Sequence, residues 1–158
     1  MGKSSKVSWI FIAFVLATFY TLGATLIESL VNYPSWYIMG PADEWLPYRQ
    51  YLTPRIILTL AVPALFIQLI TTILMLYNRP QVISRSSVWI CLILVVIVVI
   101  SSAAIQIPIQ FDLNEAYDKA ALDRIIVTDI WLRIVPAFIK TAIVCSMMYK
   151  TLNPSKTR

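Results

Sequence analysis

Four long apolar runs alternate with short polar stretches along the 158 residues of the chain. Each run is close to the roughly 20 residues that a helix needs to cross the hydrocarbon of a bilayer. Because backbone groups in lipid must be hydrogen-bonded within their own segment, these runs have to be helices. They are predicted to span the membrane at about residues 8–31, 51–77, 87–108 and 129–149. The pattern therefore predicts an all-α integral membrane four-helix bundle that forms a single transmembrane domain over residues 1–158.

The three connections between the runs differ in character. The first, from Asn32 to Gln50, holds three prolines and five Trp or Tyr residues. We expect it to be an aromatic, proline-rich loop at the membrane–water interface rather than a regular helix. The second, residues 78–87, reads as a short turn. The third, residues 112–128, has apolar residues at helical spacing behind Asn114, a residue type that caps helices. It is interpreted as a short interfacial helix before the fourth span or as an extension of that span.

Composition narrows the class of protein. Hydrophobic residues make up 59% of the chain and charged residues only 13%, whereas a soluble domain carries about 25% charged residues. The net charge of +5 does not form a basic stripe, so nucleic acid is not expected as a partner.

The residue types available for catalysis are also restricted. The chain has no histidine, and Cys91 and Cys145 have no CxxC partner. A zinc site, a histidine-ligated haem and a Ser-His-Asp triad are therefore not expected, and neither a metal nor a cofactor is predicted. The two cysteines are expected to be free thiols, with a disulfide between their spans as the alternative.

Charges separate by side of the predicted membrane. The chain ends and the second loop hold seven basic residues and no acid: Lys3, Lys6, Arg79, Arg85, Lys150, Lys156 and Arg158. All eight carboxylates lie toward the other side. The positive-inside rule therefore predicts cytoplasmic N- and C-termini, and first and third loops that face a non-cytoplasmic space.

The fourth span carries the densest set of charged residues. Asp129 and Arg133 are four residues apart with the acid first, which favours an intrahelical ion pair. Lys140 follows near the middle of the span, too deep to reach water easily, so we expect an interior partner or a neutral amine. Pro136 lies between them and is expected to kink the helix and free a carbonyl. A purely structural salt-bridge network is the alternative to a functional one.

The other spans provide polar residues that face the same region. Glu28 and Asn32 share one face at the end of the first span, and Glu28 is either an interior functional acid or an interfacial acid that reaches the headgroups. Arg55 lies on the second span, and Gln106 and Gln110 lie on the third. Together with Asp129 and Arg133, these residues are expected to ring one cavity in the non-cytoplasmic half of the membrane.

Such a cavity predicts a chemistry. Apolar walls with a few convergent polar groups are typical of a site for a hydrophobic small molecule. Arg133 is expected to keep Asp129 ionised while a less well paired Glu28 stays protonated, which gives the site an acid and a base. Such a pair can enolise a ketone, protonate an alkene or an epoxide, or activate water. The residue types are compatible with each of these reactions.

Two stretches resemble the anthrone oxygenase-like family of small four-helix membrane proteins. One is Glu28-Ser-Leu-Val-Asn32-Tyr-Pro34-Ser-Trp36, and the other is Thr128-Asp129-Ile-Trp131-Leu-Arg133. Members of this family that have been studied as enzymes oxidise polyketide anthrones without metal or flavin. The resemblance implies a membrane-embedded pocket for a flat or isoprenoid-like hydrophobe.

The sequence thus predicts a membrane-embedded enzyme of cofactor-free acid–base chemistry: an oxygenase, cyclase, isomerase or epoxide hydrolase of a biosynthetic pathway. Its substrate would be polyketide-, terpenoid- or lipid-like. The predicted catalytic residues are Glu28, Asp129 and Arg133, and the predicted substrate contacts are Asn32, Trp36, Arg55, Gln106, Gln110, Trp131 and Lys140.

Three alternatives stay open for the function and the partners. The chain is instead a non-catalytic small-molecule binder, an accessory subunit of a membrane complex, or, less favoured because four helices enclose a pathway poorly, a channel or transporter. The expected partners are the hydrophobic small molecule and the lipid bilayer, with a homo-oligomer as an open alternative.

Overall fold

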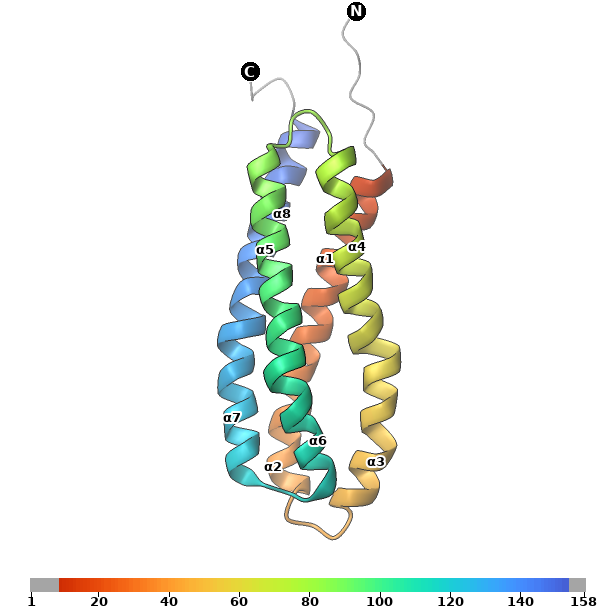
Figure 1. Ribbon diagram of the computed structural model, residues 1–158, viewed down its shortest axis with the longest axis vertical. Helices are drawn as coiled ribbons and strands as arrows, with labels where there is room; N and C mark the ends of the chain where they lie inside the picture. Colours follow the sequence, from red (N-terminus) through yellow and green to blue (C-terminus); the bar gives the residue numbers. More distant parts are fainter. Residues whose placement is uncertain (1–8, 154–158) are drawn as a thin grey trace, which may run out of the picture.

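The computed structural model describes residues 9–153, which form four long antiparallel helices (Figure 1). Each long helix consists of two α-helical parts joined by a five-residue π-helical segment. The eight α-helices are α1 (Trp9–Ile27), α2 (Tyr33–Met39), α3 (Trp45–Ile56), α4 (Val62–Asn78), α5 (Arg85–Ser101), α6 (Ile107–Glu115), α7 (Lys119–Asp129) and α8 (Val135–Leu152). The π-helical segments are Glu28–Asn32, Ile57–Ala61, Ser102–Gln106 and Ile130–Ile134. The predicted all-α four-helix bundle is confirmed, and no strand occurs within residues 9–153.

The four long helices have 31, 34, 31 and 34 residues and are long and apolar enough to cross a membrane. At 1.5 Å per residue they are about 45–50 Å long, which exceeds the roughly 30 Å of the hydrocarbon layer. The protein is therefore a multi-pass membrane protein whose helices reach beyond the hydrocarbon. The predicted spans lie inside these helices, except that Ser8, the first residue of the first predicted span, lies outside the described residues.

The bundle has two chemically distinct ends. α1 begins and α8 ends at one of them, called here the basic end, where Arg79, Arg85 and Lys150 lie (Figure 1). The four other basic residues used to predict orientation, Lys3, Lys6, Lys156 and Arg158, are outside the described residues. The opposite end, called here the acidic end, has the turns 40–44 and 116–118 and carries six of the carboxylates: Asp43, Glu44, Asp112, Glu115, Asp118 and Asp123.

Packing in the basic half is mostly apolar, although Gln68 and Lys140 are buried toward its inner side. α1 packs against α4 and α8, and α5 packs against the same two helices, so the four spans form a closed square. The buried residues that fill this half include Phe11, Phe14, Met75, Val88 and Val144. Both cysteines are free thiols, Cys91 buried and Cys145 exposed, so the disulfide alternative is ruled out.

An aromatic cluster fills the acidic half. Tyr33, Trp36 and Trp45 pack edge to face in sequence, with ring centroids 5.0 and 6.0 Å apart. Ile109, Leu113, Leu122 and Ile125 complete this cluster from the third and fourth long helices.

The first connection is more regular than predicted. Residues expected to form an irregular loop are helical on both sides of a short turn at 40–44. Pro47 is compatible with helix because it falls in the first turn of α3, where a missing N–H costs little, and Pro34 because a π-helical turn precedes it. The density of prolines was therefore a misleading sign of irregular structure.

The third connection is an extension of the fourth span rather than a separate interfacial helix. α6 runs on to Glu115, and α7 starts at Lys119 and continues into α8. The N-cap is Asp118, whose carboxylate accepts a hydrogen bond from the backbone N–H of Ala120 at 2.8 Å, and not Asn114 as predicted. Asn114 lies within α6 and bonds to the second span instead.

All four π-helical segments end two residues before a proline. Those prolines are Pro34, Pro63, Pro108 and Pro136. A proline inside an α-helix lacks the N–H that would bond to the carbonyl four residues earlier, and its ring collides with that carbonyl. In each span this carbonyl belongs to the central residue of the π-helical segment, so the wider turn lies where the clash would occur. These residues are Leu30, Thr59, Ala104 and Leu132.

Two of these carbonyls accept hydrogen bonds from neighbouring spans. Tyr20 Oη on α1 donates to Thr59 O at 3.4 Å, and Ser101 Oγ on α5 donates to Leu132 O at 3.4 Å. Side chains thus replace part of the backbone bonding that the prolines remove, as buried backbone groups require.

Candidate functional site

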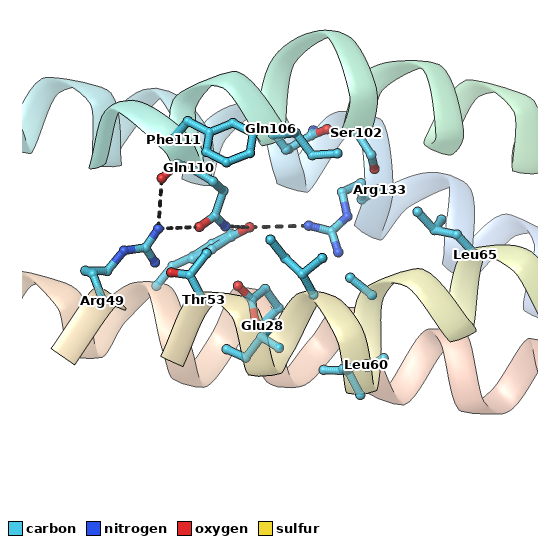
Figure 2. Close-up of a pocket in the computed structure, with 16 residues that line it drawn as sticks. Glu28, Arg49, Thr53, Leu60, Leu65, Ser102, Gln106, Gln110, Phe111 and Arg133 are labelled. Atoms are coloured by element: carbon cyan, nitrogen blue, oxygen red, sulfur yellow. Dashed lines mark hydrogen bonds between the residues drawn. The ribbon is translucent and has the colours of Figure 1, made fainter. Parts of the chain in front are cut away.

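The four π-helical segments surround a cavity of about 100 Å³ in the acidic half of the bundle (Figure 2). Each segment contributes to its wall: Glu28 from the first, Leu60 and Ala61 from the second, Gln106 from the third, and Arg133 from the fourth. Most of the remaining wall is apolar and includes Ala24, Ile56, Ile57, Leu65, Ile107 and Phe111. π-Helical turns are frequent at functional sites, and here they place polar side chains in an otherwise apolar space.

A chain of hydrogen bonds along the cavity joins all four spans. Arg49 Nη2 donates to Gln110 Oε1 at 2.7 Å, and Gln110 Nε2 donates to Tyr33 Oη at 3.3 Å. Arg133 Nη1 also donates to Tyr33 Oη, at 3.3 Å, and forms an ion pair with Asp129 Oδ1 at 2.6 Å. The other carboxylate oxygen, Asp129 Oδ2, accepts a hydrogen bond from Ser29 Oγ. The predicted intrahelical pair of Asp129 and Arg133 is confirmed, and it belongs to a larger network.

Asp129 lies behind Arg133 rather than at the cavity surface. It is fully buried, both of its oxygens are engaged by protein groups, and it is not part of the cavity wall. Its geometry suits a residue that fixes the guanidinium of Arg133, not one that exchanges protons with a ligand.

Glu28 faces the cavity with few competing contacts. Its Oε2 accepts a hydrogen bond from Asn32 Nδ2 at 2.7 Å, the i,i+4 contact expected from their spacing. Glu28 is buried and lies between Arg49 and Arg133 in the view of Figure 2. Neither cation is within ion-pair distance of it, since the one salt bridge found in the described part of the chain is Arg133–Asp129. Its carboxyl group is therefore the acid of the cavity that remains available to a ligand.

Tyr33 and Gln106 have hydrogen-bonding capacity left over. Tyr33 Oη accepts from both Gln110 and Arg133, which leaves its own O–H proton to be donated elsewhere. Gln106 is 3% exposed, and neither its Oε1 nor its Nε2 has a partner among residues 9–153. Buried polar atoms are nearly always satisfied, so an unpaired amide in a cavity wall favours a ligand or water there.

The sequence analysis predicts neither Tyr33 nor Arg49 as a site residue, although both line the cavity. Arg49 is 1% exposed and lies over the rings of Trp36 and Trp45, with its Cζ atom 4.2 and 5.6 Å from the two ring centroids. Its Nε donates to Asn114 Oδ1 at 3.0 Å, and its Nη2 donates also to Gln110 O at 3.0 Å. An arginine inside an aromatic-rich segment was the available signal. The prediction of an irregular loop for that segment leaves Arg49 out of the predicted site.

The structure separates the predicted substrate contacts into four groups. Gln106 and Gln110 line the cavity, whereas Asn32 supports Glu28 and Trp36 lies beneath Arg49 without reaching the cavity.

Arg55, predicted as part of the ring of polar residues, and Trp131, predicted as a substrate contact, both lie outside the cavity. Arg55 is exposed and turns back to its own helix, where Nη1 donates to Tyr51 O at 2.7 Å and the guanidinium covers the Tyr51 ring at 3.6 Å. Trp131 is 67% exposed on the outer surface of the bundle. Each lies two residues from an inward-facing one, Thr53 and Arg133, which in a helix is nearly the opposite face.

Lys140 lines a second, smaller cavity of about 20 Å³ toward the basic end. Gln68, whose Oε1 has no partner in the described part of the chain, lines it as well, and Arg133 and Leu65 belong to the walls of both cavities. Lys140 is buried and has no carboxylate within ion-pair distance among the described residues. Lys140 therefore lies between the main cavity and the basic end rather than in the main cavity.

Within residues 9–153, no group of three or more Cys, Asp or Glu side chains is arranged to hold a metal ion. Comparison of the chain with protein-family models, with curated proteins and with solved structures finds no match. The resemblance to the anthrone oxygenase-like family stays a prediction, and the cavity itself is the basis for a functional proposal.

Proposed function

We propose that the protein is a membrane-embedded enzyme that carries out acid–base chemistry, without metal or flavin, on a hydrophobic small molecule with a carbonyl oxygen. The observation that carries the proposal is that one carboxyl group, Glu28, faces the same apolar cavity as two donors, Tyr33 and Arg133. A base next to preorganised donors is the arrangement that removes a proton adjacent to a carbonyl.

The roles follow from the hydrogen bonds. Ionised Glu28 takes the proton from the carbon that the carbonyl acidifies, either the adjacent carbon or, as in anthrone, one conjugated to it, and the developing oxyanion accepts hydrogen bonds from the Tyr33 O–H and from Arg133. This role as a base replaces the protonated state that the sequence predicts for Glu28. Because Tyr33 Oη already accepts two hydrogen bonds, its proton is free to point at the substrate. Asp129 acts as a positioning residue that holds Arg133, which replaces its predicted role as an acid or base.

The fate of the carbanion decides the reaction. Return of the proton to a different carbon gives isomerisation, and attack on an internal electrophile gives cyclisation. With dioxygen as a second substrate, an anthrone and O₂ give an anthraquinone and water, which is the reaction that the family resemblance implies. A flat or isoprenoid-like substrate suits apolar walls of this kind.

The proposal is tested with the full chain in phosphatidylcholine vesicles. Anthrone, a long-chain β-keto ester and a lipophilic cyclic enone are supplied in D₂O, and deuterium uptake at the carbon that the carbonyl acidifies (C10 in anthrone) is followed by mass spectrometry, first without and then with O₂. We expect at least one probe to exchange faster than in protein-free vesicles, and Glu28→Gln to slow that exchange by about 10²–10⁴-fold.

Glu44→Gln is the matched control, because Glu44 is an exposed acid in the turn at the acidic end. It should exchange like the wild type. The proposal is wrong if no probe exchanges faster with protein than without, or if Glu28→Gln and Glu44→Gln behave alike. In the non-catalytic alternative, a binder or accessory subunit, the probes bind in the cavity and none is converted.

The proposal includes an orientation. The acidic end, with the cavity nearer to it, would face the non-cytoplasmic space, and both termini would lie in the cytoplasm. The support is the excess of Lys and Arg in the short connections at the basic end, which is the feature that orients multi-pass proteins.

A further inference from the structure

A groove of about 450 Å³ lies on the outside of the bundle between α3 and α6, next to the cavity. Arg49, Thr53, Ile57 and Phe111 line both the groove and the cavity. The two spaces therefore adjoin at these four side chains, between the second and third spans. A movement of these side chains would join them into one path from the lipid-facing surface to the interior.

Phe111 lies at the junction of the two spaces. Its ring is 58% exposed, and it belongs to both walls, as does Ile57 on the facing span. Leu58 and Pro54 continue the groove on the exposed side of the second span. A molecule whose polar part fills the small inner cavity has an apolar route for the rest of its length, directly into the bilayer.

Arg49 provides a permanent positive charge on this path. A guanidinium does not lose its proton in proteins, and buried charges are normally paired with an opposite charge. The acceptors of Arg49, however, are all neutral: Asn114 Oδ1, Gln110 O and Gln110 Oε1. No described carboxylate lies within ion-pair distance, and its Nη1 has no hydrogen-bond partner among residues 9–153.

Gln106 adds a second unsatisfied group further inside. Its amide has both a free donor and a free acceptor at 3% exposure, and it lines the cavity together with Arg49. The site therefore has free N–H donors on Arg49 and Gln106 and one free acceptor, the amide oxygen of Gln106. The positive charge of Arg49 lies in the same cavity wall.

We infer that the cavity and the groove together bind a single-chain, lipid-like acid that enters sideways from the bilayer between α3 and α6. Its carboxylate pairs with Arg49, and its hydrocarbon chain leaves past Phe111 along the groove. One negative charge matches the buried guanidinium of Arg49, which has no carboxylate within ion-pair distance among residues 9–153, and an apolar chain matches the apolar route. As the substrate class of the enzyme this inference rests on the proposed function, but the binding itself does not require turnover.

The test uses stearic acid with a photoreactive diazirine in mid-chain, added to the full chain in phosphatidylcholine nanodiscs. Crosslinked residues are mapped by mass spectrometry. We expect labelling to concentrate on Ile57, Leu58 and Phe111, and unlabelled oleate to suppress it at concentrations about tenfold lower than methyl oleate or oleyl alcohol, which lack the charge. Labelling spread evenly over the four spans, or equal competition by all three lipids, overturns the inference.

Two pairs of variants localise the two ends of the ligand. Arg49→Gln should reduce the specific labelling about tenfold, whereas Arg55→Gln, an exposed arginine of the same helix, should not. Arg49 also links the second and third spans, so a second pair tests the route without touching that link. Phe111→Trp should obstruct the path and lower the labelling, while Phe138→Trp, an exposed phenylalanine on α8, should leave it unchanged. Equal effects within each pair contradict the inference.

The result is separable from that of the proposed function. If labelling is specific but Glu28→Gln does not change the exchange activity, the acid–base proposal is wrong and the lipid-acid site is supported. Glu28-dependent exchange with unspecific labelling would mean the reverse.

Discussion

Asp129 and Glu28 are both buried carboxylates, yet their surroundings assign them different tasks. Asp129 is saturated by Arg133 and Ser29, whereas Glu28 keeps one hydrogen bond and faces the cavity. Spacing along the helix was enough to predict the first pair, since residues four apart meet on one face. It was not enough to show which acid faces a ligand, because that depends on the packing of the other three spans.

Asp129→Asn is expected to lower the free energy of unfolding by about 3 kcal/mol, because it leaves the buried guanidinium of Arg133 without its counter-charge. Glu115→Gln, which changes an exposed acid, should have an effect within about 0.5 kcal/mol. Denaturant titrations of both variants in micelles provide the comparison. Equal stabilities would mean that the ion pair contributes nothing to holding the bundle.

Gly40 lies so close to the Tyr117 ring that a single added carbon atom tests the packing of the acidic end. A Cβ added there would lie 1.9 Å from Tyr117 Cε2, and the Tyr117 ring packs against Trp45 with centroids 5.3 Å apart. Gly40→Ala should therefore force the ring aside and lower stability by about 1–3 kcal/mol. Gly23→Ala has nothing within 4 Å of the new atom and should leave the thermal midpoint unchanged or slightly higher. If the two variants have the same thermal midpoint, the close approach of Tyr117 to Gly40 is not important for stability.

At the scale of the helices, the π-helical segments determine which side chains reach the cavity. A π-helical turn inserts one extra residue, which rotates everything beyond it by about 100° relative to an α-helix. In the fourth span this rotation determines the direction in which Arg133 points relative to the side chains of α8.

Pro136→Ala restores the missing N–H and removes the ring that collides with Leu132 O, so the segment is expected to relax toward regular α-helix. We predict a loss of deuterium-exchange activity of about tenfold or more with helix content by circular dichroism unchanged, because Arg133 turns away from Tyr33. Pro47→Ala, at an exposed proline in the first turn of α3 that no π-helical segment precedes, should retain activity. Full activity in Pro136→Ala would contradict a role for the π-helical turn in positioning Arg133.

The spans and the Asp129–Arg133 pair could be predicted from sequence because they depend on local pattern: apolar length and four-residue spacing. The error over Arg55 and Arg49 has a specific physical cause. Treating residues up to Gln50 as a loop excluded Arg49, although Arg49 and Thr53 are four apart on the inward face, with Arg55 turned nearly opposite. The π-helical turns were also not predicted, although a proline inside or just beyond each apolar run was visible, since hydropathy does not report how a helix accommodates a proline.

At the scale of the whole molecule, the two ends of the bundle have different structural roles. The basic half has a largely apolar core with the small Lys140 cavity at its inner side, and the acidic half holds the hydrogen-bond network, the aromatic cluster and the main cavity. In lipid, interhelical polar contacts are among the forces that hold helices together. The same network therefore joins the spans and exposes the groups that we propose for chemistry.

The orientation is tested by cysteine accessibility in a background without native cysteines (Cys91→Ala, Cys145→Ala). Asp43→Cys places a thiol in the turn at the acidic end, and Ser84→Cys places one in the loop at the basic end. A membrane-impermeant maleimide added to intact cells should label Asp43→Cys at once and Ser84→Cys only after permeabilisation. The opposite pattern would place the termini outside the cytoplasm.

The central claim is that the cavity receives a carbonyl compound with its oxygen at Tyr33 and Arg133. The most direct test is a solid-state NMR dipolar measurement between the ¹³C carbonyl of labelled anthrone and ¹⁵N-arginine in the protein in lipid. The account predicts a contact in the wild type and in Arg55→Lys that disappears in Arg133→Lys, which keeps the charge beside Asp129 but removes the guanidinium nitrogens. Absence of a contact in the wild type, or the same contact in Arg133→Lys and Arg55→Lys, would contradict it.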